Sequence, residues 1–515
     1  DIFRKDLANS TLIKVHEYFN DLCNICKSYS NVNLNRVMTY NNSNNVYVPE
    51  LYDLFLSTIT SIRDIAVSIC YFLYKSELSS IKKIDTYLKD EFVVIGDVHA
   101  QFYGLLAQLK GCGAINDLGQ WIAQEKTYVF LGDYFDRGTE GLECYILLRL
   151  YQSLATMNKS TVILLMGNHE LDKLFRPNTS NFYALKEKLI LCQDIESDNL
   201  KLMYSNINNN CIFVHADFEI IAKQILIYRL LLKKQSTVDE NTIQIIKELK
   251  TEISRIVSIR MDDNLSLLEC IEDPKIIYPE YKISDEKLIE IMEKNNWTIE
   301  DLAREANICL GQIKQIVQTT YFNDTDFRKI ITNKGKEDDL KVNLMFTAYL
   351  LVKFITWSRL NFIDKSKYVE YTKTQIIIAG HNSPKSISDA AFKRINNTIC
   401  IDAGLCFYRR PLFAVISCKD CVVYEGNILE NEKEDKVSCK IDWKKQVVSL
   451  KLNETYKLKH EFDYYNEFDY YNEFDDTEDN SICIENIDLG SLLEFIKDNN
   501  MAENKNNSDI EQNNS

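Results

Sequence analysis

Five short motifs in the sequence combine residue types that bind divalent metal ions. Each motif follows a short apolar run, and in chain order they read GDVH, GDYFDRG, GNHE, HAD and GHN. Their candidate ligands are two carboxylates, an amide and three imidazoles: Asp97, His99, Asp133, Asn168, His215 and His381. Mixed oxygen and nitrogen donors suit Mn, Fe or Zn better than Ca or Mg alone. The sequence therefore predicts two divalent ions, bridged by Asp133, that generate a hydroxide nucleophile near neutral pH.

Other polar residues of these motifs could act on a phosphoryl group. His169 directly follows Asn168 and cannot easily share its metal ion, so we expect His169 to protonate the leaving oxygen as a general acid. Asp136 could hold that imidazole oriented and protonated. Arg137 is placed to contact two phosphate oxygens at once, and an ion pair with a loop carboxylate is its alternative role.

The elements that must position these residues read as short buried strands. Five apolar, β-branched runs end abruptly at the motifs: Phe92–Ile95, Tyr128–Leu131, Val162–Met166, Cys211–Val214 and Ile376–Ala379. Continuous apolar runs of this length are typical of strands that are buried on both faces. Helical patterns separate the first runs, over Phe102–Lys110 and Gly141–Met157. The pattern predicts a layered α/β architecture in which the polar residues gather at the carboxyl ends of the strands.

In this order, the motifs resemble the signature of the phosphoprotein phosphatase branch of the calcineurin-like metallophosphoesterases. The resemblance covers about residues 91–218 and 355–425. It implies a layered αββα sandwich in which the six candidate ligands hold two metal ions. It also implies that Arg137, Asn168 and His169 contact phosphate or donate the proton, and that the substrate is a phosphoprotein or a phosphorylated small molecule.

Two segments resemble the bacterial-like phosphatases and the diadenosine-tetraphosphatase-like group within that branch. They are residues 109–121 (LKGCGAINDLGQW) and Trp357-Ser358-Arg359. The second segment would offer Arg359 as a further phosphate ligand, with a structural ion pair as the alternative. Gln101-Phe102-Tyr103 instead matches the classical eukaryotic enzymes.

Three positions depart from the family pattern without removing a metal ligand. Ala100 stands where glycine is usual, Met166 where classical members carry arginine, and Ala216-Asp217 where two glycines are usual. Ala100 adds a Cβ where the backbone bends, and Asp217 adds a negative charge near an anion site. Such changes would weaken activity or shift specificity.

The chain divides by composition and pattern into five regions. We expect a helical N-terminal region, a metallophosphoesterase domain in two parts, a helical insertion between those parts, and an acidic low-complexity linker and tail. The N-terminal region is residues 1–90, and the two parts of the domain are residues 91–218 and 351–458. The insertion between them is residues 219–350, and the linker and tail are residues 459–515. The N-terminal helices, the insertion and the tail are the candidate surfaces for protein partners.

Residues 284–320 of the insertion read as a helix-turn-helix. Thr298 would cap a helix, and Asn307 would form the turn. The second helix offers only Lys314 as a cation, so it would neutralise DNA phosphates poorly. We therefore expect a helical cap that shapes access to the site in preference to a DNA-binding element.

Composition excludes several classes of protein. The chain has 515 residues and a formal net charge of −16, which excludes a generally basic nucleic-acid binder. No apolar run approaches the roughly 20 residues of a membrane-spanning helix. Its 15 cysteines are scattered through apolar segments, as expected of reduced thiols in a cytoplasmic protein. The CxxC pairs Cys23/Cys26 and Cys418/Cys421 lack the further ligands of a zinc site.

Three functions are consistent with these observations. The first is a metal-dependent phosphomonoesterase, expected to be a serine/threonine-type phosphoprotein phosphatase. The second is a pyrophosphohydrolase that acts on dinucleoside polyphosphates or an RNA cap. The third is a phosphatase-like scaffold of weak activity, because metal ligands alone do not establish turnover.

Overall fold

The computed structural model describes about half of the chain, in segments between residues 65 and 449. The described residues are 65, 68–69, 72–73, 78–81, 83–84, 92–175, 182–206, 211–218, 220–234, 239–260, 282–319, 340–357, 376–383, 393–395, 398–408, 410–417, 420–430 and 439–449. All of them belong to the compact unit formed by residues 1–456. Arg359, the Cys23/Cys26 pair, Cys418 and the acidic tail lie outside the described residues.

The first of two sheets has seven strands in the order β12-β11-β10-β1-β2-β3-β4. Its parallel half comprises β1 (Phe92–Ile95), β2 (Thr127–Phe130), β3 (Thr161–Leu165) and β4 (Leu200–Lys201). Its antiparallel half comprises β10 (Leu412–Ile416), β11 (Asp420–Glu430) and β12 (Cys439–Ser449). The parallel half therefore directs the carboxyl ends of β1, β2 and β3 to one edge of the sheet.

The second sheet has five strands in the order β5-β6-β7-β9-β8. Its strands are β5 (Tyr204–Asn206), β6 (Cys211–Phe213), β7 (Ile376–Ala379), β9 (Thr398–Cys400) and β8 (Lys393–Ile395). β6, β7 and β9 are parallel neighbours. The strands that precede His215 and His381 therefore also end at a common edge.

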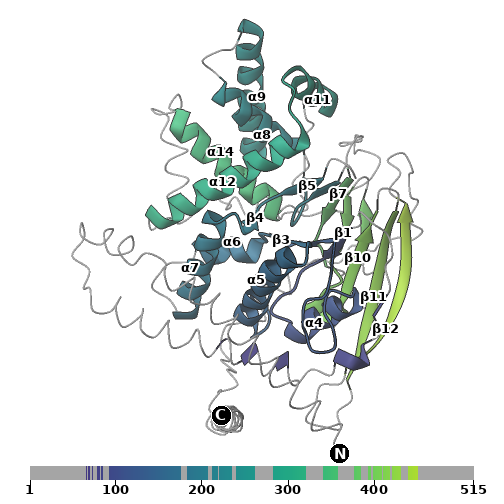
Figure 1. Cartoon of the computed structure of the whole chain (residues 1–515). Coiled ribbons are helices and arrows are strands. Elements are labelled where there is room, and N and C mark those ends of the chain that lie inside the picture. The colour runs from purple at the N-terminus through teal and green to yellow at the C-terminus, as the bar shows by residue number, and fades with distance from the viewer. Residues whose placement is uncertain are drawn as a thin grey trace, which may run out of the picture. The chain divides into compact units, whose positions relative to one another are not determined.

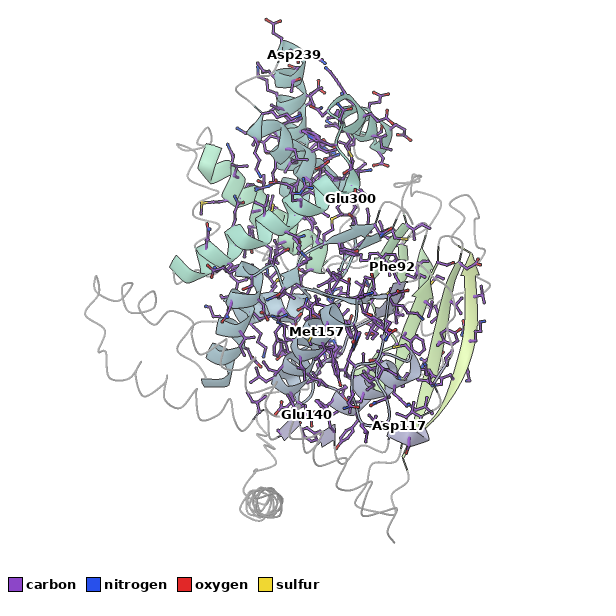
Figure 2. All side chains as sticks on the ribbon, in the orientation of Figure 1. Phe92, Asp117, Glu140, Met157, Asp239 and Glu300 are labelled. Carbon is purple, nitrogen blue, oxygen red and sulfur yellow. The ribbon has the colours of Figure 1, made fainter. Side chains whose placement is uncertain are left out.

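Both faces of the central strands are buried, as the continuous apolar runs predict. Alternate residues such as Val94 and Val129 face Phe213 and Ile378 of the second sheet in a core between the sheets. The intervening residues, such as Val93, face a second core that is built largely with helices. Helices α4 (Phe102–Gly111) and α5 (Gly141–Met157) cover the first sheet, and side chains fill the interior (Figure 2). The predicted layered α/β sandwich is confirmed.

Further helices follow strands β3, β6 and β9. α6 (Asn168–Phe175) and α7 (Phe182–Glu196) lie after β3, and α15 (Leu405–Tyr408) follows β9. The region between β6 and β7 contains α8 (Ile220–Lys233), α9 (Glu240–Arg260), α11 (Asp285–Lys294), α12 (Ile299–Thr319) and α14 (Leu340–Trp357), which gather at the top of the view in Figure 1. α14 continues past residue 350, where the sequence predicts the end of the insertion. In the described part of the chain, no helix is both long and apolar enough to cross a membrane.

The predicted helix-turn-helix is wrong, because α12 is one continuous helix. Thr298 does cap it, since the Asp301 backbone N–H donates to Thr298 Oγ1 (3.4 Å) and the Asp301 carboxylate accepts from the Thr298 N–H (2.8 Å). The predicted turn residue, Asn307, lies within the helix, where its side-chain oxygen accepts from the backbone N–H groups of Leu202 (2.8 Å) and Met203 (3.2 Å). The asparagine therefore fastens α12 to the segment between β4 and β5.

Candidate functional site

The five motifs meet where strands of both sheets end. GDVH and GDYFDRG follow β1 and β2, GNHE opens α6 after β3, and His215 and His381 follow β6 and β7. The structure brings all six predicted metal ligands together, and each is at most 5% exposed. Two groups of side chains have potential ligand atoms within 4.8 Å of one another: Asp133–His215–His381, which are all predicted ligands, and His99–Asp133–His169, which includes the predicted general acid.

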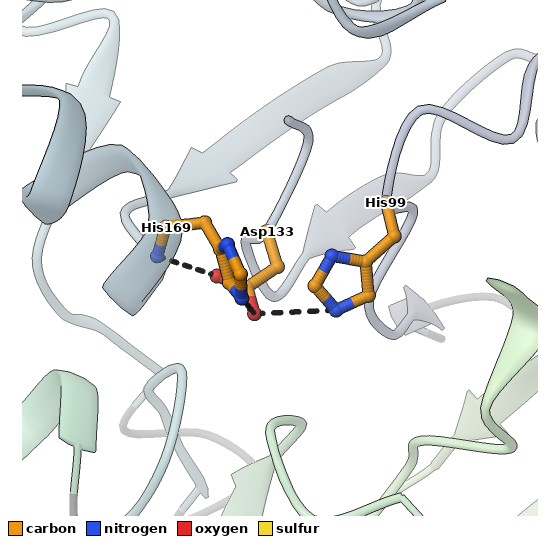
Figure 3. Close-up of side chains that lie close together, drawn as sticks. All are labelled: His99, Asp133 and His169. Carbon is orange, nitrogen blue, oxygen red and sulfur yellow. Dashed lines mark hydrogen bonds and ion pairs between the residues drawn. The ribbon is translucent and has the colours of Figure 1, made fainter. Parts of the chain in front are cut away.

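Asp133 belongs to both groups and lies at the centre of the site (Figure 3). Its Oδ2 lies 3.5 Å from His99 Nε2 and 3.9 Å from His169 Nε2, and its Oδ1 lies 3.4 Å from His215 Nε2. Asp97 lies beside this cluster, with Oδ2 3.8 Å from His99 Nε2. Asp133 is therefore surrounded by three imidazole nitrogens, those of His99, His169 and His215.

Backbone carbonyls orient two of the imidazoles. Nδ1 of His215 donates to the Leu131 carbonyl oxygen (2.8 Å), and Nδ1 of His99 lies 3.3 Å from that of Phe135. A histidine held in this way turns Nε2 towards the cluster and fixes its tautomer, as is usual for metal-bound histidines.

Glycines in the motifs allow the carboxylates to approach the backbone. A Cβ on Gly167 would lie 2.1 Å from Asp133 Oδ1, and a Cβ on Gly380 would lie 2.3 Å from Asp97 Oδ1. The freed space is used for hydrogen bonding, because the N–H of His169 donates to Asp133 Oδ1 (3.0 Å) and the N–H of His381 donates to Asp97 Oδ1 (3.0 Å). The glycines of GNHE and GHN are therefore required by the positions of the two aspartates.

The loops of the site hold an unusual backbone conformation. Six non-glycine residues in them have positive φ angles between 47° and 64°: His99, Ala100, Asp133, Asp136, Arg137 and His381. Such conformations cost of order 1–3 kcal/mol each and cluster at functional sites. Ala100 keeps this conformation although it has a Cβ, and its side chain is fully buried. The departure from glycine at this position is therefore accommodated.

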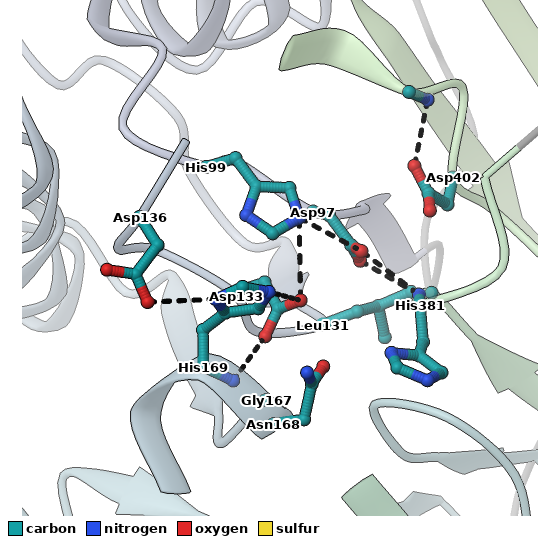
Figure 4. A network of polar contacts seen from close by, with 12 residues as sticks. Asp97, His99, Leu131, Asp133, Asp136, Gly167, Asn168, His169, His381 and Asp402 are labelled. Atoms are coloured by element: carbon teal, nitrogen blue, oxygen red, sulfur yellow. Dashed lines mark hydrogen bonds and ion pairs between the residues drawn. The ribbon is translucent and has the colours of Figure 1, made fainter. Parts of the chain in front are cut away.

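Buried charge is concentrated around the two aspartates. Burial and the nearby Asp402 raise the pKa of Asp97, whereas burial lowers the pKa of His99 to about 3, with Arg137 acting in the same direction. For His215, burial alone would lower the pKa, but Asp133 and Asp97 raise it to about 9. Asp402, which the sequence did not single out, accepts from the Gly404 N–H (2.8 Å) and lies beside Asp97 (Figure 4).

The Asn168 amide faces acceptor atoms of the cluster. The amide atom on this side lies 2.9 Å from His215 Nε2, 2.9 Å from His381 Nδ1 and 3.1 Å from Asp133 Oδ2. The amide NH₂ group satisfies these acceptors when it faces the cluster, and with the amide oxygen on this side a proton or a metal ion takes that role. Carboxylate, imidazole and amide atoms packed in this way match the coordination shell of Mn, Fe or Zn.

His169 forms a dyad with Asp136 at the edge of this cluster. Its Nδ1 lies 2.9 Å from Asp136 Oδ2, and its ring packs edge-on against that of His99. Burial would lower the pKa of His169, but the carboxylates of Asp133 and Asp136 raise it above its usual value. Arg137, which follows Asp136 of the dyad in the chain, is an exposed residue.

Glu170 has a structural role that the motif pattern did not reveal. It is fully buried, and its Oε2 accepts from the backbone N–H groups of Asp133 (2.8 Å) and Gly167 (2.8 Å). Its Oε1 accepts from those of Tyr134 (2.7 Å) and Phe135 (3.4 Å). One carboxylate therefore fixes the GDYFDRG loop to the start of the GNHE motif.

We expect Glu170→Gln to lower the free energy of unfolding by about 2–3 kcal/mol, although the side-chain volume is unchanged. In the wild-type protein, four backbone N–H groups donate to the Glu170 carboxylate. In the variant, the amide NH₂ group faces some of these donors and cannot accept from them. Urea unfolding of the two proteins should be compared at one pH and one metal content. Glu293→Gln, on the exposed side of α11, is the control, and an equal loss in both variants would contradict the role of Glu170.

Two of the family departures point away from the reaction centre. Met166 is fully buried in the core that contacts the helices, so no side chain from this position contacts the anion site. Asp217 Oδ1 accepts from the Phe218 N–H (2.7 Å) and lies 3.3 Å from Thr398 Oγ1. Trp357 of the other family-like segment packs 6.2 Å from the His381 ring, measured between ring centroids. Arg359 lies outside the described residues.

The comparison with protein families matches the motif-bearing region. The sequence profile of the calcineurin-like phosphoesterases matches residues 91–254, which extends past residue 218 into α8 and α9. Serine/threonine-protein phosphatase 7 of Arabidopsis thaliana is 42% identical over 78 residues, or 15% of this chain and 16% of that protein. Shewanella-like protein phosphatase 1 of Plasmodium berghei (strain Anka) is 33% identical over 108 residues, or 19% of this chain and 30% of that protein.

These alignments span less than a third of each of the two relatives. Among solved structures, the cold-active protein-tyrosine phosphatase of a psychrophilic Shewanella species aligns with 68% of this chain and 82% of its own. That alignment has 16% identity and a TM-score of 0.36. Residues 91–254 of this chain therefore match the calcineurin-like phosphoesterase family, and the curated proteins to which the chain is similar include phosphatases.

Proposed function

We propose that the chain is a metal-dependent phosphomonoesterase, and specifically a serine/threonine-type phosphoprotein phosphatase. The observation that carries the proposal is Asp133, which lies at the centre of both groups of ligand atoms, with the His169–Asp136 dyad beside it. A shared carboxylate between two cation sites, next to a histidine of raised pKa, is an arrangement suited to phosphate-ester hydrolysis.

Two divalent ions are part of this proposal. Asp97, His99 and Asp133 would hold one ion, and Asp133, Asn168, His215 and His381 would hold the other. Bound ions of this kind lower the pKa of water and neutralise charge on a phosphoryl group. We propose Mn, Fe or Zn because imidazole nitrogens are present together with carboxylate oxygens.

The residues of the chain would divide the remaining work. The exposed guanidinium of Arg137 would bind two phosphate oxygens and orient the ester. His169 would give the proton on Nε2 to the leaving oxygen, while Asp136 keeps Nδ1 protonated through the 2.9 Å contact. The net charge of −16 makes local cations such as Arg137 necessary to attract an anionic substrate.

A likeness to the bacterial-like and diadenosine-tetraphosphatase-like members of the branch belongs to the proposal as well. It is supported by the sequence of residues 109–121 and by Trp357, which packs beside His381. An intracellular location is also proposed, because the cysteines are scattered through apolar segments of the sequence, as is usual for reduced thiols.

A substrate panel tests the proposed function. Purified protein is stripped with a chelator, reloaded with Mn, and assayed on phosphoserine and phosphothreonine peptides, p-nitrophenyl phosphate and diadenosine tetraphosphate. We expect hydrolysis of the monoesters, loss of activity after stripping, and its return with Mn. Hydrolysis of the dinucleotide alone would replace the phosphatase assignment with a pyrophosphohydrolase. The absence of turnover with Mn, Fe and Zn would support a binding scaffold instead.

A further inference from the structure

Lys173 contacts the proposed acid dyad from the side opposite His169. Its Nζ lies 2.5 Å from Asp136 Oδ1 and 2.8 Å from Glu187 Oε2. The lysine is 5% exposed, so its ammonium group is held between two carboxylates away from bulk water. The dyad is therefore one end of a row of alternating charges that runs from Glu187 through Lys173 and Asp136 to His169.

The geometry of α6 produces this arrangement. His169 and Lys173 are four residues apart in a helix of eight residues, so their side chains project from the same face. Asp136 lies across from that face, with Oδ2 on the histidine and Oδ1 on the lysine. Both carboxylate oxygens of Asp136 are thus fixed, and the carboxylate cannot rotate away from Nδ1 without breaking an ion pair.

The third member of the row belongs to a different helix. Glu187 is on α7, and its carboxylate holds Lys173 from the far side. Asp136 itself has a φ of 63°, a conformation that needs support from its surroundings. Lys173 gives that support directly, and Glu187 gives it through Lys173.

We propose that Lys173 is a positioning residue for proton transfer by His169, and that Glu187 anchors Lys173 for this purpose. The inference rests on the proposed function, because it concerns the step in which the leaving oxygen is protonated. Lys173 does not contact the substrate in this scheme. It fixes Asp136, which in turn fixes the direction in which His169 presents Nε2.

The proposal predicts an effect that depends on the leaving group. A phosphoserine peptide or phenyl phosphate releases a basic oxygen that needs a proton, whereas p-nitrophenyl phosphate releases a phenolate that needs much less help. We expect Lys173→Met to lower kcat for the first two substrates by about 10- to 100-fold, the scale on which the loss of an outer-shell partner lowers activity at metal sites. For p-nitrophenyl phosphate we expect less than about a 3-fold change, and KM should change little for all three substrates.

Three further variants make this result specific. Glu187→Gln should act in the same direction with a smaller loss. Lys247→Met, an exposed lysine of α9, should match the wild-type protein on every substrate. In the double variant with Asp136→Asn, the effect of Lys173→Met on the phosphoserine peptide should disappear, because the carboxylate that the lysine positions is already neutral.

Two results would overturn the inference: an equal loss of kcat on all three esters, or a full additional loss in the double variant. A wild-type protein that hydrolyses no ester would instead overturn the proposed function. The ion pair would then be judged by the melting temperatures of four proteins: the wild type, Lys173→Met, Asp136→Asn and the double variant. Non-additive changes would support the contact, and additive ones would refute it.

Discussion

Asp133→Asn is expected to lower kcat for phosphate monoesters by at least about two orders of magnitude, the scale of a lost metal centre. The carboxylate is 1% exposed and lies within 3.5 Å of both His99 Nε2 and His215 Nε2. Asparagine keeps the shape of the side chain but offers one oxygen and no charge, so it cannot serve two cations equally. We therefore also expect the bound metal content to fall below that of the wild-type protein.

Both quantities can be measured on the same preparation, with turnover at saturating Mn and metal content by elemental mass spectrometry. Asp198→Asn is a matched control, since Asp198 has a side chain that is 70% exposed and a φ of 58°, a conformation that asparagine tolerates. The control should keep full activity and full metal content. If Asp133→Asn also kept its metals and at least a tenth of the wild-type kcat, Asp133 would not be the bridging ligand.

His169→Ala should lower kcat on phosphoserine peptides by about two to four orders of magnitude, the usual contribution of a general acid. The loss on p-nitrophenyl phosphate should be much smaller, because its leaving group departs without a proton. Full activity of the variant on a poor leaving group would show that His169 is not the acid.

Metal content decides between the two roles that the position of His169 allows. Its Nε2 lies 3.9 Å from Asp133 Oδ2, close enough to form a ligand group with His99. A general acid can be removed without loss of metal, whereas a ligand cannot. We expect His169→Ala to bind as much metal as the wild-type protein, and a lower content would reassign His169 as a ligand.

Sequence patterns predicted the central strands closely because these strands are buried on both faces. Phe92–Ile95 and Ile376–Ala379 match β1 and β7, and Gly141–Met157 matches α5. The patterns were less accurate for the antiparallel strands of the first sheet, where a tight turn interrupts the apolar run. By its apolar pattern alone, Leu412–Glu425 predicts a single strand. The N–H of Ser417 instead donates to the Asp420 carbonyl, and a turn separates β10 from β11.

The missed features of the site depend on contacts between distant residues. Glu170 binds backbone groups near position 134, Lys173 binds Glu187 of another helix, and Asp402 lies beside Asp97. None of these partners is close enough in sequence to form a local pattern. The same limit explains the incorrect turn at Asn307, since an asparagine within a helix is unfavourable by local preference and is retained here by its bonds to Leu202 and Met203.

The helices between β6 and β7 share their core with the strands that carry the site. Residues of α8, α12 and α14 pack in one continuous cluster with Val214 and Ala379, and the N–H of Ala216, next to His215, donates to the Ile355 carbonyl oxygen of α14 (2.9 Å). A minimal enzyme therefore cannot be obtained by deleting this region. Truncation would expose apolar surface and release the loop of His215. A deletion that abolished activity would therefore show that the site had lost its structural support, not that a catalytic group had been removed.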